Sequence, residues 1–461
     1  MQSNKLPSSF RDPCGYVFSK NNQIFRVINK NYKAEYTHLM QSGLYKELIR
    51  KGLLIKHQEV FLDNIVYKII KPQLVQYISY PYEWSFNQLK DAALTALKIQ
   101  KTALKFSMSL KDCSAYNFQF INLKPALIDT LSFEKYELGS PWIAYKQFCQ
   151  HFLAPLALAY YKDIRLNNLL KHYLDGIPLD LASKLLPIST YFKLPLLINL
   201  HLHAKSQRYY SQKKQLDQIK KLSIRKMAKN SLLALIDNLT VAINGLSWKE
   251  DYSFWDNYYN DNSYSKKSFD NKVSIFKKYL SLCSSSKNLL DLGSNSGIFS
   301  FIASKSGLDT VALDYDYSCV DRIYLIAKEK KYHNILPIIN DLSNPSGNLG
   351  WNFQERSSLK DRFTSDITLS LALMHHLIIG NNVPLDDCVN FISDLTKKYL
   401  IIEYVSIHDS QVQEMIQLRR NYHAYTESDF VQAFSKKFKI IKKDNISQES
   451  NRVMYLMKKN R

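Results

Sequence analysis

The sequence lacks the cysteine patterns of disulfide-bonded or zinc-binding proteins. Its 461 residues contain six cysteines, and no two of them are spaced as C-x-x-C. Scattered cysteines are typical of proteins that stay in a reducing compartment, and structural zinc sites usually need paired cysteines. We therefore expect no disulfide framework, no metal site and a cytoplasmic location.

The sequence also lacks segments that enter a membrane. The N-terminal residues MQSNKLPSSFRD contain no apolar core of a secretory signal. The most apolar stretch, residues 185–202, includes Lys193 and His201, which interrupt it too often for a membrane-spanning helix. We expect no membrane span.

Acidic residues are outnumbered by basic ones, 41 to 62, which gives a formal net charge of +21. Such a charge permits nucleic acid or an anionic membrane as a partner. Lysine is spread along the chain together with asparagine, isoleucine and tyrosine, however, and an AT-rich coding sequence produces the same composition. Residues 205–229 carry nine Lys or Arg against one Asp, which indicates a solvated linker, with a nucleic-acid patch as the alternative.

The most informative stretch is residues 288–316, NLLDLGSNSGIFSFIASKSGLDTVALDYD. A short apolar run leads into a Gly/Ser/Asn turn, a helical pattern and a second apolar run that ends on Asp314. Gly293 and Gly297 suit a turn with unusual backbone angles, and the helix after it points N–H groups at a ligand. Asp314 follows Gly293 by 21 residues, where nucleotide-binding folds place a carboxylate for ribose hydroxyls.

The turn reads D-x-G-x-x-x-G from Asp291 onward, and not the G-x-G-x-x-G of a dinucleotide site. This pattern resembles motif I of the class I S-adenosylmethionine-dependent methyltransferases. The resemblance implies S-adenosylmethionine as the cofactor and an α/β fold, a Rossmann-like seven-stranded sheet with an antiparallel seventh strand. The cofactor-binding candidates are Asp291, Gly293, Ser294, Asn295, Gly297, Asp314 and Asp341.

The rest of the C-terminal half supplies the strands that such a sheet needs. We predict them at residues 288–292, 310–314, 335–339, 366–373, 399–402, 438–441 and 453–457, with helices between most of them. Acidic residues stand at or next to the ends of four of these strands. Ligands bind at the carboxyl ends of parallel strands, so Asp341 is expected near the cofactor. The resemblance to class I methyltransferases implies that this acidic residue after the third strand accepts from the adenine amino group.

Candidate catalytic residues follow the fourth and fifth strands. His375 or His376 is the predicted general base, since imidazole titrates near neutral pH, although either could instead cap the next helix. Glu403 could orient that base, bind the acceptor or be an ordinary strand-end acid. Asp409, Ser410, Arg419 and Arg420 lie where acceptor specificity is usually built, against a default of surface charge.

Two nucleic-acid methyltransferase signatures are absent. No N-P-P-Y follows the fourth strand, which disfavours chemistry on adenine N6, and the only Pro-Cys dipeptide, Pro13-Cys14, is far from the sheet. The chain therefore shows no nucleophile for cytosine C5.

The N-terminal half contains a second pattern. A hairpin at 16–29, a helix at 36–51, strands at 65–70 and 74–80, and a helix at 86–106 precede Asp112, Asn117 and Asp129. D-x-x-x-x-N followed by a strand and an Asp resembles protein-kinase-like and aminoglycoside-phosphotransferase-like folds. The resemblance implies Asp112 as the base, with Asn117 and Asp129 holding Mg²⁺ beside ATP.

That second resemblance is incomplete. The hairpin has no glycine-rich loop, Lys111 precedes Asp112, and the V-A-I-K strand is missing, with Arg26 as the nearest cation. We therefore expect an α+β domain of degenerate kinase-like fold. The alternative is three polar residues in the loops of an unrelated domain.

Longer stretches resemble one bacterial family of class I methyltransferases related to a nodulation protein. They include DPCGYVF, SAYNFQF, DGIPLDLASKLLP, GWNFQERSSLKDRF and LSLALMHHLIIGNNVPLDDC, so the resemblance covers almost the whole chain. It implies methyl transfer to a small-molecule or glycan acceptor. Three alternatives stay open: a kinase-like phosphotransferase, a non-catalytic nucleotide-sensing protein and an RNA methyltransferase.

The expected domains are 1–204 (α+β, kinase-like, with a helical C-terminal part), 205–250 (basic helical linker) and 251–461 (methyltransferase). Residues 251–270 are rich in tyrosine, asparagine and serine. They are expected either to lie over the cofactor and acceptor or to be plain surface.

Overall fold

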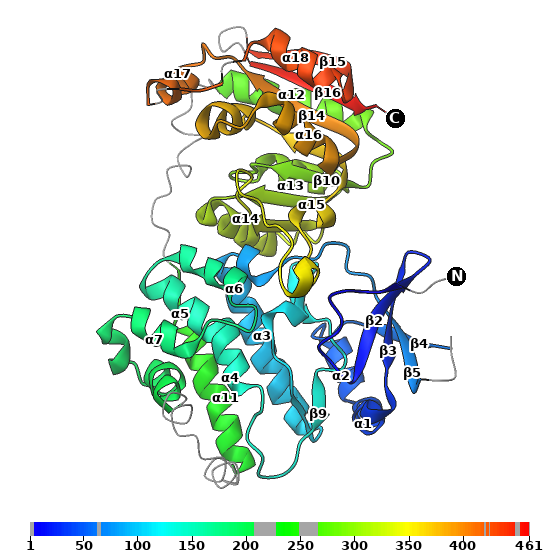
Figure 1. Ribbon diagram of the computed structural model, residues 1–461, viewed down its shortest axis with the longest axis vertical. Helices are drawn as coiled ribbons and strands as arrows, with labels where there is room; N and C mark the ends of the chain where they lie inside the picture. The colour runs from blue at the N-terminus through cyan, green and yellow to red at the C-terminus, as the bar shows by residue number, and fades with distance from the viewer. Residues whose placement is uncertain are drawn as a thin grey trace. The chain divides into compact units, whose positions relative to one another are not determined.

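The structure, a computed structural model, describes residues 4–61, 66–206, 227–248, 266–418, 421–423, 425–447 and 452–460. The chain forms two compact units (Figure 1). Unit 1 is Met1–Lys249 with Asn348–Arg356, and unit 2 is Glu250–Gly347 with Ser357–Arg461. Most of the predicted linker at 205–229, most of the aromatic segment at 251–270, and Arg419 and Arg420 lie outside the described residues.

Unit 2 is built on a seven-stranded sheet with the order β12-β11-β10-β13-β14-β16-β15. The first five strands in this order run parallel, and β16 is antiparallel to both of its neighbours. The seven strands match the seven predicted runs, with shifted ends. Their bounds are β10 Asn288–Leu292, β11 Asp309–Asp314, β12 Ile335–Ile339, β13 Ser365–Ser370, β14 Thr396–Val405, β15 Phe438–Ser447 and β16 Arg452–Lys459.

Helices cover both faces of this sheet (Figure 1). On one face, Phe276 and Phe299 pack at a T-shaped angle over buried strand residues such as Leu289 and Ile401. Burying these side chains is the main force that holds the layers together. The helices are α12 Lys266–Leu282, α13 Ile298–Lys305, α14 Tyr317–Glu329, α15 Leu359–Arg362, α16 Leu385–Leu395, α17 Ser410–Gln417 and α18 Glu427–Ser435, with the short π-helix η9 His376–Gly380.

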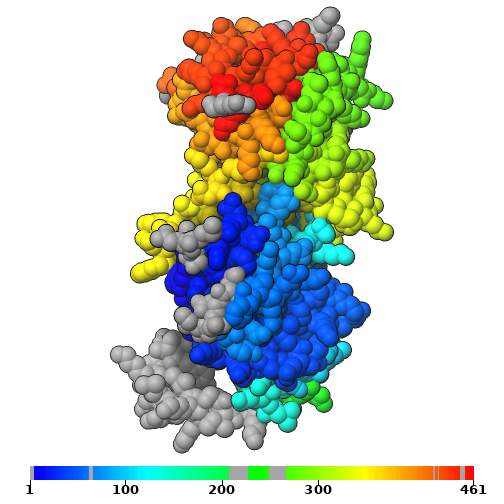
Figure 2. All heavy atoms as spheres, turned by 90° about the vertical axis from the view of Figure 1, so that its right-hand side faces the viewer, coloured from blue at the N-terminus to red at the C-terminus, as the bar shows by residue number. Residues whose placement is uncertain are grey.

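Helix α12 is fixed to β15 by side-chain hydrogen bonds. The Tyr279 hydroxyl donates to Asp444 Oδ2 at 2.8 Å, and Asn271 Nδ2 donates to the carbonyl of Ile446 at 2.7 Å. Figure 2 shows this helix, in green, beside the C-terminal strands. The first turns of α12 also reach the carboxyl end of β14, where Lys272 Nζ lies 2.7 Å from Glu403 Oε2.

Unit 1 begins with a five-stranded antiparallel sheet in the order β1-β2-β3-β5-β4. The predicted hairpin is present, and its turn is the two residues Asn21 and Asn22, both at positive φ. The predicted helix at 36–51 is two helices, because Gly43 at φ +90° breaks it. The bounds are β1 Asn4–Lys5, β2 Gly15–Lys20, β3 Gln23–Ile28, α1 Lys33–Gln41, α2 Leu44–Arg50, β4 His57–Val60 and β5 Lys68–Pro72.

The strand predicted at 74–80 is wrong, and β4 was not predicted. The side chain of Gln119 pairs with the backbone of Ser79 in both directions, at 2.9 Å each. The Gln119 amide thus makes the hydrogen bonds to the N–H and carbonyl of Ser79 that a neighbouring strand would otherwise make. The segment then enters a 3-10 turn at Pro81–Glu83.

The rest of unit 1 is mainly helical around α3 Phe86–Lys105, which begins with a capping box between Ser85 and Gln88. The later helix α11 Lys229–Asn244 packs against α3, with an ion pair of 2.6 Å between Lys101 and Asp237. The sequence placed this helix in a linker, whereas it belongs to unit 1 in the structure. The other elements are β6 Met108–Leu110, β7 Phe118–Ile121, β8 Lys124–Leu127, β9 Phe133–Lys135, α4 Tyr145–Phe148, α5 Ala154–Tyr161, α6 Leu169–His172, α7 Leu179–Leu185 and α8 Leu194–Leu196.

The short segment 348–356 lies between β12 and β13 in the chain but belongs to unit 1. The Arg11 guanidinium donates twice to the buried carboxylate of Glu355, at 2.6 and 3.0 Å. The Arg356 guanidinium lies 4.3 Å from the ring centre of Tyr116. No sequence pattern indicated that a segment between two strands of unit 2 belongs to unit 1.

No described helix combines the length and apolar character needed to cross a bilayer.

Candidate functional site

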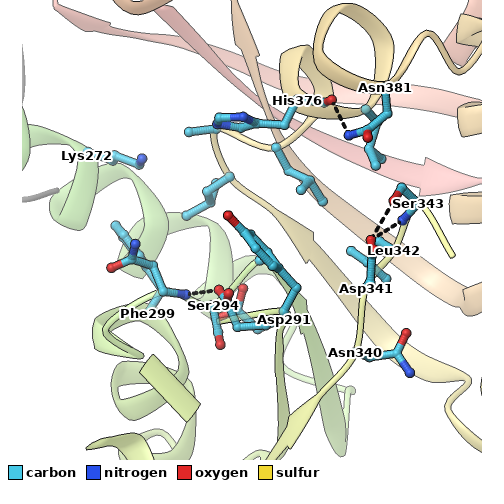
Figure 3. A pocket seen from close by; sticks show the side chains of 18 residues that line it. Lys272, Asp291, Ser294, Phe299, Asn340, Asp341, Leu342, Ser343, His376 and Asn381 are labelled. Carbon is cyan, nitrogen blue, oxygen red and sulfur yellow. Dashed lines mark hydrogen bonds between the residues drawn. The ribbon is translucent and has the colours of Figure 1, made fainter. Parts of the chain in front are cut away.

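Unit 2 contains a pocket of about 340 Å³ at the carboxyl ends of its parallel strands (Figure 3). Lys272 and His376 lie on one side of it, and Asn340 and Asp341 lie on the other. Of the residues singled out in the sequence, seven line the pocket: Asp291, Gly293, Ser294, Asn295, Asp314, Asp341 and His376. Gly297, His375 and Glu403 do not line it.

The floor of the pocket is the turn between β10 and α13. The N–H groups of Gly293 and Ser294 both donate to the carbonyl of Leu313, at 2.9 and 2.8 Å, which fixes the turn to β11. Gly293 and Gly297 both have φ of +76°, a conformation that disfavours side chains. A Cβ at Gly297 would also lie 2.7 Å from Ile323 Cγ1, so this glycine is needed for packing rather than for contact with the pocket.

Asp314 ends β11 with its carboxylate at the pocket wall. Its Oδ2 accepts from the N–H of Asn295 at 2.6 Å, and its Oδ1 accepts from the N–H of Asp316 at 3.0 Å. Burial raises the pKa of Asp314 to about 6, and the two backbone donors oppose that rise. Near neutral pH the group is a fixed acceptor for hydroxyl donors in the pocket.

Asp291 lies deeper, within the last residues of β10. Its Oδ2 accepts from the Ser300 hydroxyl at 2.6 Å, and burial raises its pKa to about 7. A cation bound nearby would lower that pKa, because an opposite charge favours the ionised form. The site is therefore suited to a ligand that carries positive charge.

Two polar residues follow β12 on the far side of the pocket. Asp341 Oδ1 accepts from both the N–H and the hydroxyl of Ser343, at 2.8 and 2.6 Å. The buried Oδ1 of Asn340 has no hydrogen-bond partner among the described residues. A buried acceptor of this kind is usually satisfied, so a ligand N–H group is the natural partner.

Four buried charged side chains lie behind the side of the pocket that Lys272 and His376 form. They are Lys272, Glu403, Arg452 and Asp409. The Lys272 ammonium, which reaches the pocket from α12, lies 2.7 Å from Glu403 Oε2. Arg452 contacts Glu403 Oε1 at 3.5 Å and Asp409 Oδ2 at 2.8 Å. Burial lowers the pKa of Lys272, and Glu403 opposes that effect. Glu403 thus acts on the pocket through Lys272, a residue that the sequence did not single out because lysines are frequent on helices.

The two candidate histidines differ in position. His376 lines the pocket, and burial, with a smaller effect of Arg452, lowers its pKa to about 4. The His375 ring, 4.3 Å away between ring centres, is fully buried, and its Nδ1 has no hydrogen-bond partner among the described residues. Burial holds the pKa of His375 well below the usual value. Both imidazoles are neutral near pH 7, and His376 is the one that a ligand can reach.

Asp409 and Ser410 lie at the start of helix α17. Asp409 caps α17 by accepting from the N–H of Gln411 at 3.1 Å, in addition to pairing with Arg452. Ser410 is the first residue of that helix. Neither lines the pocket.

The second predicted group, Asp112, Asn117 and Asp129, lies in unit 1. Both oxygens of Asp129 contact the Arg26 guanidinium, at 3.0 and 3.2 Å, and Arg26 also contacts Asp12 at 3.1 Å. Burial raises the pKa of Asp129, Arg26 lowers it and the charge of Asp112 raises it. The carboxylate expected to hold Mg²⁺ is therefore paired with a guanidinium.

Asp112 and Asn117, the other two members of that group, also make hydrogen bonds within unit 1. Asp112 Oδ1 accepts from Gln147 Nε2 at 2.9 Å, and the carbonyl of Asn117 accepts from the N–H of Ile128 at 2.8 Å. Within the described parts of the chain, no three His, Cys, Asp or Glu side chains are grouped as metal ligands.

No family model matches the sequence of this chain. The chain is 31% identical to the nodulation protein NoeA of Rhizobium meliloti (strain 1021) over 462 aligned positions, which cover 98% of this chain and 95% of that protein.

Solved structures show weaker likenesses to part of the chain. The magnesium protoporphyrin IX methyltransferase of Synechocystis PCC 6803 with bound SAH is 16% identical, covering 45% of this chain and 92% of that one, with a TM-score of 0.31. The N-methyltransferase NodS of Bradyrhizobium japonicum WM9 is 10% identical, covering 42% and 98%, with a TM-score of 0.31. The bifunctional kinase-methyltransferase WbdD is 15% identical, covering 43% of this chain and 41% of WbdD, with a TM-score of 0.32.

Proposed function

Because the chain belongs to the family of the nodulation protein NoeA, and because unit 2 joins a glycine turn to a strand-end carboxylate in one pocket, we propose that it is an S-adenosylmethionine-dependent methyltransferase. The acceptor in this proposal is a small molecule or a glycan, and the reaction takes place in the cytoplasm. The observation that carries the proposal is the carboxylate of Asp314, held by the backbone of the glycine turn at the pocket wall.

The order of the sheet supports this assignment. Written in the order of the chain, the strands of unit 2 run 3-2-1-4-5-7-6 across the sheet, with the seventh antiparallel. This arrangement is typical of class I methyltransferases, and the pocket lies where open α/β sheets bind ligands. The domain that we assign to this role is residues 251–461, without the segment 348–356.

The residues of the pocket fit the parts of S-adenosylmethionine. Asp314 would accept from the ribose hydroxyls, and Asn340 Oδ1 or Asp341 from the adenine amino group. The turn at Gly293 lets the backbone come close to the methionine part, Asp291 offsets its positive charge, and Lys272 would pair with its carboxylate. The bound cofactor supplies an activated methyl group for in-line displacement.

The protein's own contribution to the transfer is positioning and acceptance of a proton. His376 Nδ1 or Nε2 is the proposed acceptor of the proton that leaves the methylated atom. Since its pKa is about 4, His376 is neutral but weakly basic at pH 7. His376 therefore suits a methyl acceptor whose own proton becomes acidic as the new bond to the methyl group forms. Glu403 holds Lys272 and so keeps that side of the pocket in place.

Unit 1 is proposed to be a degenerate kinase-like domain that binds or presents the acceptor. The antiparallel sheet, the turn at 81–83 and the long helix α3 come in the order that such a fold requires. Phosphotransfer is not supported. Arg26 occupies both oxygens of Asp129, and the two-residue turn at Asn21 and Asn22 offers no glycine-rich loop for phosphates.

The acceptor class is tested by incubating the full chain with labelled S-adenosylmethionine and three acceptor sets side by side: glycan intermediates, small hydroxyl compounds and RNA. Label in the first or second set supports the proposal. Label in RNA alone contradicts it and favours an RNA methyltransferase. Cofactor binding without transfer to any set favours a ligand-sensing protein.

A further inference from the structure

Residues 184–205 of unit 1 form a surface on which apolar side chains point outward. The exposed fractions are 78% for Ile188, 84% for Phe192 and 61% for Leu194. Soluble proteins rarely expose several large apolar residues next to one another unless the patch binds something. The exposed apolar members of this surface are Leu185, Ile188, Tyr191, Phe192, Leu194, Ile198 and Leu202.

The outward direction of these side chains follows from the helix that carries them. Leu194–Leu196 continues into the π-helix Leu197–Leu202, and Leu194, Ile198 and Leu202 recur every four residues, so they share one stripe. On the opposite side, Leu196 and Leu200 are buried in unit 1. The helix is therefore apolar on both faces, and among the described residues only the face with Leu196 and Leu200 is buried.

Buried polar contacts hold this segment in its position. The imidazole of His201 lies between the hydroxyls of Ser183 and Thr190, at 2.8 and 2.9 Å. Asn199 donates to Asn238 Oδ1 at 2.7 Å and accepts from the Tyr145 hydroxyl at 2.7 Å. A segment fixed by two such side chains presents its apolar face as a formed surface.

The charges on this surface have one sign. From residue 181 to residue 206 the sequence contains no Asp or Glu, and the three lysines, Lys184, Lys193 and Lys205, are all exposed. Apolar side chains interleaved with lysines fit the boundary between acyl chains and anionic headgroups. A second copy of the same surface would place lysine against lysine, which is unfavourable.

We propose that residues 184–205 bind the surface of an anionic lipid membrane. Phe192, Ile188 and Leu194 enter the boundary between headgroups and acyl chains, and the lysines pair with lipid phosphates. In this proposal the segment lies in the plane of the membrane surface. This binding is independent of the proposed methyl transfer.

Sedimentation of the full-length protein with vesicles tests the proposal. The vesicles contain phosphatidylglycerol and phosphatidylcholine in equal parts, or phosphatidylcholine alone. We expect binding to the anionic vesicles that weakens with salt. Phe192→Ser with Leu194→Ser should weaken it at least about tenfold. Lys184→Gln and Lys193→Gln should each weaken it about fivefold.

Matched controls come from exposed residues elsewhere in unit 1. Leu138→Ser changes a side chain that is 85% exposed, and Lys105→Gln changes an exposed lysine; both should bind as the wild type does. Circular dichroism melts show that all variants fold. Wild-type protein that stays in the supernatant, or a double serine variant that binds as well as Leu138→Ser, overturns the proposal. So does a dimer in analytical ultracentrifugation that the double variant abolishes when no vesicle binding is seen.

Discussion

Lys272 and Glu403 form an ion pair, with 2.7 Å between Nζ and Oε2, and both side chains are buried. Lys272 lies on helix α12, and Glu403 lies on strand β14 of unit 2. This pair links the pocket to Arg452 and Asp409. It therefore couples the shape of the proposed cofactor site to the stability of unit 2.

Glu403→Gln is expected to destabilise the protein by about 3–5 kcal/mol, because it leaves the buried Lys272 and Arg452 without their shared carboxylate. Urea unfolding measures the loss. The control is Asp386→Asn, which breaks the exposed pair with Lys436 and should cost less than about 1 kcal/mol. Equal losses of unfolding free energy in the two variants would show that the buried charges do not stabilise unit 2 more than an exposed ion pair does.

Asp291→Asn should change how stability depends on pH. The pKa of Asp291 in the folded protein, about 7, is above the unfolded value of 3.8, so the folded state holds the proton more tightly. The stability that Asp291 contributes is therefore present at low pH and lost as pH rises from about 4 to about 7.

The Asn variant should accordingly match the wild type near pH 4 and exceed it at pH 8, by an amount on the order of 1–3 kcal/mol. Urea unfolding at several pH values, without ligand, measures the difference. A difference that is the same at pH 4 and pH 8 would contradict the assignment of a raised pKa to this carboxyl.

Gly297→Ala should destabilise unit 2 more than Gly307→Ala. Both glycines have positive φ, but a Cβ at Gly297 meets Ile323 at 2.7 Å, whereas one at Gly307 meets no atom within 4 Å. The control therefore isolates the backbone strain of roughly 1 kcal/mol, and Gly297→Ala should cost about 1–3 kcal/mol more. Thermal or urea unfolding compares them, and similar losses would count against the packing role.

Asp129→Ala should destabilise unit 1 without changing any nucleotide-dependent property. The substitution leaves Arg26 with Asp12 alone, and we expect a loss of about 1–3 kcal/mol. Calorimetry with ATP and Mg²⁺ should show no binding to the wild type. Magnesium-dependent ATP binding that Asp129→Ala abolishes would instead restore the phosphotransferase interpretation.

The sequence predicted the strands of unit 2 well because each is a short apolar run bounded by a turn or an acid. Asp314 could be placed at the site from spacing alone, since a strand end fixes where its last side chain lies. Lys272 could not, because it reaches the pocket only through tertiary packing of α12. The segment 74–80 was mistaken for a strand because nothing local shows that Gln119 binds its backbone.

The most direct test of the central claim is calorimetric titration of S-adenosylhomocysteine into the wild-type protein and into Asp314→Ala. Losing a charged contact to the ribose, worth roughly 1.5–3 kcal/mol, should weaken binding about ten- to a hundredfold. Asp309→Asn, at the opposite end of the same strand, should leave the affinity unchanged. A wild type that does not bind S-adenosylhomocysteine, or an Asp314→Ala variant that binds it equally well, would contradict the account.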